Sequence, residues 1–404
     1  MDKILGLLIR KNRIEKNYSQ EGLCQGICVV SYLSKIENGQ VEPSEDIIAA
    51  LFKALGMRYE RDEEYLEKIR ERIQKYFEHY FLHNLSKEEE AGLVTELESE
   101  YERISQSRLY LSAELFRWYR SNYEDKQIEN RLTALKDYME PPQKALFHLG
   151  KSFLSVKEGE EEAHLMKSFS YLPSSMTAFF LANHYMVVGQ YHKSIVYSQK
   201  TFDLAVSEGC LYYMVEGSVL LGFCYSNERQ IELMLEHFNR AKALAKGVYS
   251  NIEGNVDYNI GATLAECKQY KEAYSYLKNA FLCVDQGKRI PTLHYHKLSL
   301  VCAQLGRREE ALHYIHAARE NFDEKEPAVY KQLITSIDMR LSSDYLEKEE
   351  YLQLIESIYE TLKVEYPFGF QRFYGDFLIE AYVAKRKYKE ALRVSLEMQK
   401  SLFK

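Results

Sequence analysis

The sequence has few of the residues that interrupt helices. Its 404 residues include only 7 prolines and 19 glycines, and these are the residue types that end helices and build tight turns. A β architecture needs a turn after every short strand, so this composition disfavours it and favours a helical protein. The length exceeds that of one ordinary domain and predicts two or three.

Long apolar runs are also missing. No run approaches the roughly 18 residues of a membrane helix, and the first one, residues 4–9, is too short for the apolar part of a secretory signal. The seven cysteines form no C-x-x-C pair and are odd in number. We therefore expect a cytoplasmic protein with free thiols and no membrane contact.

An excess of positive charge is absent as well, because the net charge is -7. Any contact with nucleic acid must come from a local surface. The sequence holds no glycine-rich phosphate loop, no G-x-S-x-G and no H-E-x-x-H. Histidine pairs such as His79 and His83 lack the further ligands that a metal needs. We expect no enzyme activity, no metal and no cofactor.

The first sixty-five residues read as a bundle of short helices. Residues 4–14 place apolar side chains at helical spacing, with basic side chains on the other face. Ser19 is suited to cap a second helix, and Gly26 makes a break. A third helix is predicted over residues 29–37 and ends at Asn38-Gly39, where glycine favours the left-handed conformation after a helix. A fourth is predicted over residues 46–55.

The string Ser19-Gln20-Glu21-x-Leu23, then residues 32–39 (YLSKIENG), then Pro43-Ser44, resembles the Xre/lambda-repressor class of helix-turn-helix. In such a fold Leu33 and Ile36 pack inward, and the third helix presents its other face to base edges. The resemblance implies that Gln20 contacts a phosphate of the DNA. Other residues of the domain are expected to contact the DNA backbone too. The predicted DNA-binding residues are Arg10, Arg13, Gln20, Val30, Ser31, Tyr32, Ser34, Lys35 and Asn38.

The charge of this domain leaves one alternative open. Residues 1–60 carry eight basic and eight acidic side chains, which fits a protein-docking module as well as a DNA binder. Residues 1–20, however, carry five basic and two acidic side chains. Since the electrostatic footprint of a DNA binder is a property of one face, we favour double-stranded DNA as the partner.

The rest of the chain repeats itself. A small or apolar residue recurs at positions 194, 234, 273, 311, 354 and 391, in steps of 40, 39, 38, 43 and 37 residues. In several copies another small residue follows seven places later, as in Ala241, Ala280 and Ala318. This resembles the tetratricopeptide repeat, whose stacked helix pairs form a concave surface. Residues 66–145 fit the pattern poorly, although they read as helical.

A helix-turn-helix joined to such repeats resembles the RRNPP family of peptide-responsive quorum-sensing regulators, in particular its NprR/PlcR-like branch. The resemblance implies an all-α fold with a DNA-binding domain over residues 1–65 and an α-solenoid over residues 66–404 for peptide sensing and dimerisation. It also implies a short signalling peptide as ligand and a homodimer. Some members bind a response regulator in addition.

A peptide groove needs side chains that bond an extended backbone, and asparagine offers both a donor and an acceptor. Taking Gly222 and Gly261 as markers of phase, the asparagines nearby fall on the face that is concave in this repeat class. Each could equally be a solvated helix residue. The predicted peptide-binding residues are Asn183, Glu216, Asn227, Asn255, Tyr258 and Asn259.

Two other functions remain open. One is a repeat protein without a DNA role that sequesters or modulates a response regulator or another protein, as Rap-like proteins do. The other is an enzyme of the phosphatase-stimulating Rap type, which shares the repeat fold. Proteins of both kinds lack the residue 19–39 string, so the N-terminal domain discriminates between these functions and a transcriptional regulator. The peptide, the operator and the direction of regulation do not follow from the sequence.

Overall fold

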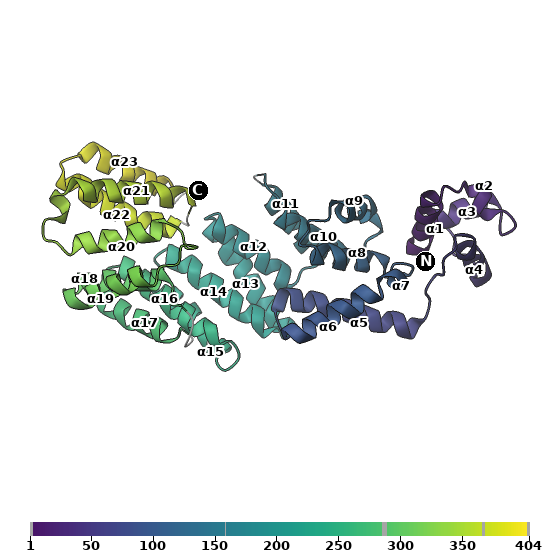
Figure 1. Ribbon diagram of the computed structural model, residues 1–404, viewed down its shortest axis with the longest axis horizontal. Coiled ribbons are helices and arrows are strands. Elements are labelled where there is room, and N and C mark those ends of the chain that lie inside the picture. Colours follow the sequence, from purple (N-terminus) through teal and green to yellow (C-terminus); the bar gives the residue numbers. More distant parts are fainter. Residues whose placement is uncertain (1–2, 158, 285–288, 366–367, 402–404) are drawn as a thin grey trace. The chain divides into compact units, whose positions relative to one another are not determined.

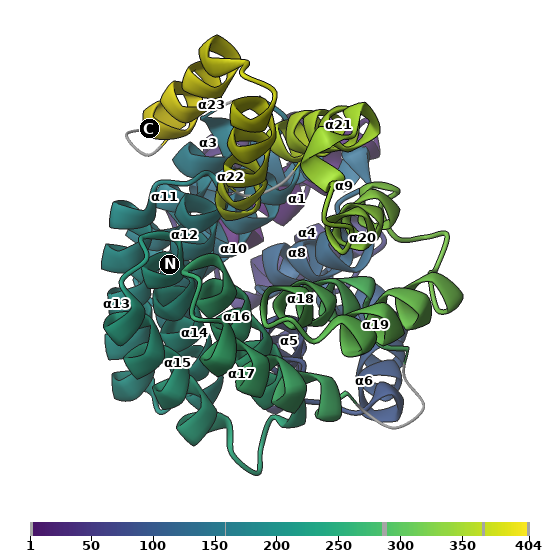
Figure 2. The ribbon, with the colours of Figure 1, turned by 90° about the vertical axis from the view of Figure 1, so that its left-hand side faces the viewer.

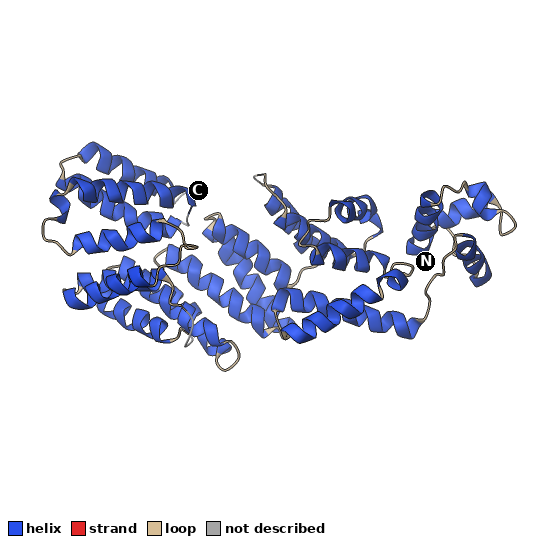
Figure 3. Cartoon of the chain, viewed as in Figure 1, coloured by secondary structure: helices blue, strands red, loops and turns tan. Residues whose placement is uncertain are grey.

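The computed structural model describes residues 3–157, 159–284, 289–365 and 368–401. Every regular element within these ranges is a helix, which confirms the predicted all-α fold (Figure 3). The chain divides into two compact units, residues 1–173 and 174–404 (Figure 1). Each unit is described separately below.

The first unit begins with the predicted helix-turn-helix. Its helices are α1 (Lys3–Glu15), α2 (Gln20–Cys24), α3 (Val30–Glu37) and α4 (Glu45–Ala54). The Ser19 hydroxyl accepts a hydrogen bond from the Gly22 amide at 2.9 Å, as expected of a helix cap. Gly39 has a φ of 68°, which confirms the predicted stop after α3.

Close backbone contact fixes α1 against α3. A Cβ added at Gly6 would lie 2.1 Å from the carbonyl oxygen of Ile36, so no residue with a side chain fits there without movement. Leu33 and Ile36 are buried, as predicted. Ile48, Leu51 and Phe52 of α4 are buried, as is Leu55 directly after the helix, whereas Ile47 is half-buried.

Over its described residues, the first unit contains seven further helices and one short 3-10 helix. They are α5 (Glu63–Leu82), α6 (Lys87–Ser99), α7 (Tyr101–Ile104), α8 (Tyr110–Arg120), α9 (Lys126–Leu135), η1 (Lys136–Tyr138), α10 (Pro141–Phe153) and α11 (Glu160–Tyr171).

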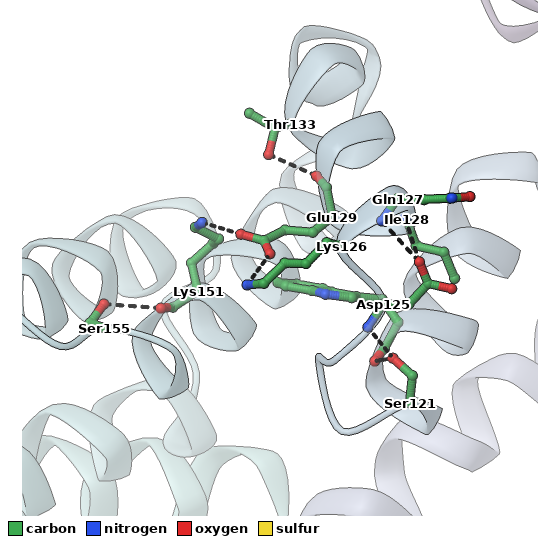
Figure 4. A network of polar contacts seen from close by, with 10 residues as sticks. Ser121, Asp125, Lys126, Gln127, Ile128, Glu129, Thr133, Lys151 and Ser155 are labelled. Carbon is green, nitrogen blue, oxygen red and sulfur yellow. Dashed lines mark hydrogen bonds and ion pairs between the residues drawn. The ribbon is translucent and has the colours of Figure 1, made fainter.

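Polar contacts hold α9 to α10 (Figure 4). Asp125 caps α9 by accepting hydrogen bonds from the amides of Gln127 and Ile128 at 2.9 and 3.0 Å. Glu129, which is almost fully buried, accepts from Lys126 at 2.8 Å and from Lys151 of α10 at 2.5 Å. Burial raises the pKa of Glu129, but the two lysines outweigh it and hold that pKa below its ordinary value. This buried carboxylate is therefore charged and paired.

The second unit consists of consecutive helix pairs. They are α12 (Ser175–Val187) with α13 (Tyr191–Glu208), α14 (Leu211–Asn227) with α15 (Ile231–Ala245), α16 (Ser250–Glu266) with α17 (Tyr270–Leu282), α18 (Thr292–Gln304) with α19 (Arg308–Glu320), α20 (Val329–Arg340) with α21 (Glu349–Glu365), and α22 (Phe368–Ala384) with α23 (Tyr388–Ser401).

The small positions found in the sequence lie early in the second helix of each pair. Ser194, Met234, Ala273 and Ala311 are fully buried there, and Ala391 is nearly so. Several glycines of the first helices are packed as tightly against the second helices, with no room for a side chain. A Cβ added at Gly222 of α14, for example, would lie 2.4 Å from the ring of Phe238 on α15.

A recurring left-handed turn explains the regular step of the repeats. In five of the pairs, the second residue after the first helix has a positive φ, and the second helix begins two residues later. Glycine favours this conformation, yet only two of the five positions hold it. The five residues are Gly189, Arg229, Lys268, Gly306 and Arg386.

The pair α20 and α21 departs from this rule. A 3-10 helix, η2 (Tyr345–Glu347), lies between its two helices and replaces the short turn. The extra residues account for the one long step of 43 residues, between positions 311 and 354. Leu354 accordingly sits at the sixth residue of α21, whereas the other markers sit at the fourth residue of their helices.

The first helices of the pairs form the inner layer of the second unit. Successive first helices from α12 to α20 contact one another. Figure 2 shows α16, α18 and α22 on the inside, with their partners α17, α19 and α23 on the outside. We call the face of α12, α14, α16, α18, α20 and α22 that points away from the second helices the inner surface.

The two compact units do not divide the chain at residue 65. The helix-turn-helix falls in the same compact unit as α5–α11, and the clearest repeats form the second unit. Residue 65 as the end of the DNA-binding domain therefore stays a prediction about function.

Candidate functional site

The predicted recognition helix α3 presents a polar outer face. Leu33 is fully buried, whereas 41% of Val30 is exposed. Ser31, Lys35 and Asn38 are exposed, and Ser34 is half-buried beside them. The structure thus places the predicted base-reading residues on one side of α3. We call Val30, Ser31, Ser34 and Lys35 the recognition face.

Under this helix lies a charged network that the sequence did not indicate. Glu37, at the end of α3, is 2% exposed. One of its oxygens accepts from Arg13 Nε at 2.6 Å; the other accepts from Arg13 Nη2 at 2.9 Å and from Gln20 Nε2 at 2.8 Å. Arg13 Nη1 donates to the carbonyl of Tyr18 at 3.0 Å. Glu37 therefore joins α1, α2 and α3.

This network changes the interpretation of two predicted DNA contacts. All three guanidinium nitrogens of Arg13 are bonded within the protein, and the hydrogen bond to Glu37 raises its pKa above the ordinary value. Arg13 thus has a structural role. Gln20 lies at the start of α2, half-buried, with its amide nitrogen on Glu37. Contacts of Arg13, Gln20 and the exposed Arg10 with phosphates remain predictions.

We expect Glu37→Ala to destabilise the helix-turn-helix by about 3 kcal/mol, because it leaves the largely buried Arg13 charge without its partner. Hydrogen exchange of the full chain is the measurement, with faster exchange in α1–α4 and unchanged exchange in α12–α23. Glu42→Ala, which removes an exposed carboxylate from the same domain, is the control. Equal protection of α1–α4 in both variants would contradict the structural role of Glu37.

The second candidate surface is the inner surface of the second unit. The six predicted peptide-binding residues all lie on three successive first helices. Asn183 is on α12, Glu216 and Asn227 are on α14, and Asn255, Tyr258 and Asn259 are on α16. Their position in the repeat predicts this placement on the first helices. Their hydrogen bonds and burial show which of them are available to a ligand.

Three of the asparagines differ in how much of the amide is in use. Asn227 is bonded at both ends: its oxygen accepts from the Tyr191 hydroxyl at 3.2 Å and its nitrogen donates to the Phe223 carbonyl at 2.9 Å. Asn259 donates to the Asn255 carbonyl at 2.7 Å, which leaves its amide oxygen as an acceptor. Asn255 itself is exposed. Asn227 is thus the least available of the three.

An aromatic pair lies between α16 and α18. The rings of Tyr258 and His294 stack with centroids 4.5 Å apart. Among the described residues, neither the Tyr258 hydroxyl nor His294 Nδ1 has a hydrogen-bond partner, although both atoms are buried. Burial lowers the pKa of His294 to about 4, so its ring is neutral near pH 7. On α14, burial raises the pKa of Glu216. His294 was not predicted.

Further along, polar contacts fasten α18 to α16 and α22. The Lys297 side chain is 1% exposed, with its nitrogen 3.1 Å from a Glu266 oxygen. His296 Nε2 and the Tyr374 hydroxyl are 2.5 Å apart, and both residues are fully buried. These residues were missed because their partners lie 31 and 78 positions away in the sequence.

Other chemistry finds little support among the described residues. The seven cysteines are free thiols. Burial raises the pKa of the Cys28 thiol, so a smaller fraction of it is in the reactive thiolate form. In the described ranges no three acidic, histidine or cysteine side chains gather as a metal site. Over the same ranges, no helix combines the length and hydropathy of a membrane span.

Comparison with known proteins now bears on both surfaces. A family model described as helix-turn-helix matches residues 9–60. The transcriptional activator NprA of Geobacillus stearothermophilus is 23% identical over 280 residues, which cover 64% of this chain and 68% of NprA. The chain thus carries a helix-turn-helix over residues 9–60 and is similar in sequence to a transcriptional activator.

Solved structures show that this chain shares its fold with other proteins. A Rap protein complexed with competence and sporulation factor superposes with a TM-score of 0.64 at 14% identity, covering 83% of this chain and 98% of the other. NprR in complex with its cognate peptide NprX gives a TM-score of 0.57 at 16% identity, covering 85% and 100%. At such identities the likeness establishes the fold.

Proposed function

We propose that the chain is a peptide-responsive transcriptional regulator. It reads operator DNA through the recognition face of α3 and binds a short signalling peptide on its inner surface. The observation that carries the proposal is the exposed recognition face within a matched helix-turn-helix. That domain is joined to the fold that NprR uses in its peptide complex.

The inner surface supplies what an extended peptide needs. Amide side chains on α12 and α16 offer donors and acceptors at intervals along the surface, and a main-chain segment can bond to them whatever its side chains are. Burial alone raises the pKa of the half-buried Glu216, so a positively charged ligand group beside it would stabilise its ionised form. Asn183, Asn255 and Asn259 are the residues on which peptide binding chiefly depends.

A homodimer is the assembly that fits this function, because helix-turn-helix proteins of this class read two half-sites about one helical turn apart. The second unit, with residues upstream of it, would carry the dimer contacts and the peptide. A response regulator would be a further partner in the alternative, Rap-like role, for which the fold shared with a Rap protein is the support. The Rap-like role does not require a helix that reads DNA, so it leaves the exposed recognition face of α3 without a function.

Native mass spectrometry of the full chain, with and without peptides extracted from spent culture medium of the source cells, tests the assembly and the ligand together. We expect a dimer that gains the mass of one short peptide per protomer. A strictly monomeric protein, also with promoter DNA present, would contradict the dimer. A dimer that retains no peptide would contradict the proposed peptide binding and leave the proposed dimer standing.

A further inference from the structure

The linker between α4 and α5, residues 58–62, is hydrogen-bonded to the turn between α7 and α8; these four helices are labelled in Figure 1. The amide of Glu60 donates to the Gln106 carbonyl at 2.9 Å. The amide of Arg58 donates to the Gln106 side-chain oxygen at 3.2 Å. A connection that could have been free in solvent is therefore held along its backbone.

The side chain of Glu60 strengthens this attachment. This side chain is only 10% exposed. One oxygen accepts from the amides of Arg61 and Asp62, both at 2.8 Å, and the other accepts from Arg103 Nε at 2.5 Å. Burial raises the pKa of Glu60, but the bonds from Arg103 and the two amides outweigh it and leave the pKa below its ordinary value. The carboxylate is thus ionised near pH 7.

Two cation–aromatic contacts extend the attachment on either side. The Arg103 guanidinium lies 3.5 Å from the centroid of the Tyr65 ring at the start of α5. Lys11 of α1 lies 4.9 Å from the ring centroid of Tyr110, the first residue of α8. The helix-turn-helix therefore touches α8 directly as well as through its linker. Polar contacts thus join the helix-turn-helix and its linker to α5, α7 and α8, and each side-chain contact can be removed by one substitution.

We propose that Glu60, Arg103 and Gln106 form a latch that sets the spacing between the two DNA half-sites the dimer accepts. The proposal rests on the proposed function, because it concerns how two helix-turn-helix domains are presented to DNA. Adding one base pair moves a half-site by about 3.4 Å along the axis and turns it by about a tenth of a helical turn. A latched domain cannot follow that movement, whereas a domain on a free linker can.

The test is selection of bound sequences from a random double-stranded DNA library, with the spacing between enriched half-sites as the readout. The full-length parent should return one spacing. Arg103→Ala should return the same half-site sequence at several spacings, and its preference for the parental spacing should fall roughly tenfold because the linker then behaves as a flexible tether. Glu60→Gln, which keeps an oxygen for the two amides and loses the charge, should fall between them.

Arg70→Ala is the matched control, because Arg70 pairs with Glu67 within α5 alone at 2.6 Å. It should return the parental spacing. Hydrogen exchange at the Glu60 amide verifies that the latch is open in Arg103→Ala. A single, unchanged spacing in that variant, with the Glu60 amide exchanging fast, overturns the latch. A parent that enriches no paired half-sites overturns the DNA-binding function itself and the latch's role with it.

Discussion

Replacing Ser31 and Ser34 together with glutamate should abolish binding to the protein's own promoter DNA, with a loss of more than roughly a hundredfold. Two carboxylates on the recognition face would repel the flanking phosphates. They also have no hydrogen-bond donor for the acceptor atoms on the base edges. The fold should survive, because Ser31 is exposed and Ser34 is half-buried. A glutamate at position 31 also stands four residues before Lys35, which favours the helix.

Gel retardation measures the DNA affinity, and circular dichroism measures the helicity. Ser170→Glu with Ser207→Glu is the control, because both serines are exposed on helices outside the helix-turn-helix and add the same charge. That control should bind the promoter as the parent does. Normal retardation by the Ser31 and Ser34 double variant would show that α3 is not the recognition helix.

The triple variant Asn183→Ala, Asn255→Ala, Asn259→Ala should lose measurable peptide binding while it still binds DNA. Each amide that bonds the peptide backbone contributes about 1 kcal/mol, so one substitution should weaken binding roughly five- to tenfold. The cost rises where a buried peptide amide is left without a partner. DNA binding should persist because α3 and the inner surface belong to different compact units.

Calorimetric titration with the peptide found by mass spectrometry measures the loss. Asn239→Ala with Asn279→Ala is the control, since these asparagines are exposed on α15 and α17, which are second helices. Unchanged affinity in the triple variant would place the peptide elsewhere, and the weak repeats between residues 66 and 145 would be the next region to test. Asn227→Ala should act mainly on stability, because its amide joins α14 to Tyr191 of α13.

The local features of this protein were predictable because they depend on residues close together in the chain. A serine cap needs an amide three residues on, as Ser19 has in Gly22. The repeat marker needs only a steady spacing, and Ala273 and Ala311 are fully buried where that spacing placed them. The irregular step before Leu354 was visible as well, although its cause, the 3-10 helix η2, was not.

The contacts that give single residues their roles were not predictable. Arg13 looked like one of several basic residues on α1, and its partner Glu37 lies 24 positions later. Glu60 and Arg103 are 43 positions apart and meet only because α7 and α8 return to the linker. Tyr258 was proposed for its phase, yet the ring of His294 covers it. No periodicity reports which side chains meet between helices.

By itself, then, the sequence determined the all-helical fold, the helix-turn-helix with its outward-facing α3, and the register of the repeats. These follow from helix periodicity, caps and turns, whose energies are set within a few residues. The tertiary structure alone decided which polar groups are already bonded and which remain for a ligand. That depends on how distant helices pack, because a buried amide or charge must find its partner wherever the fold brings one within about 3 Å.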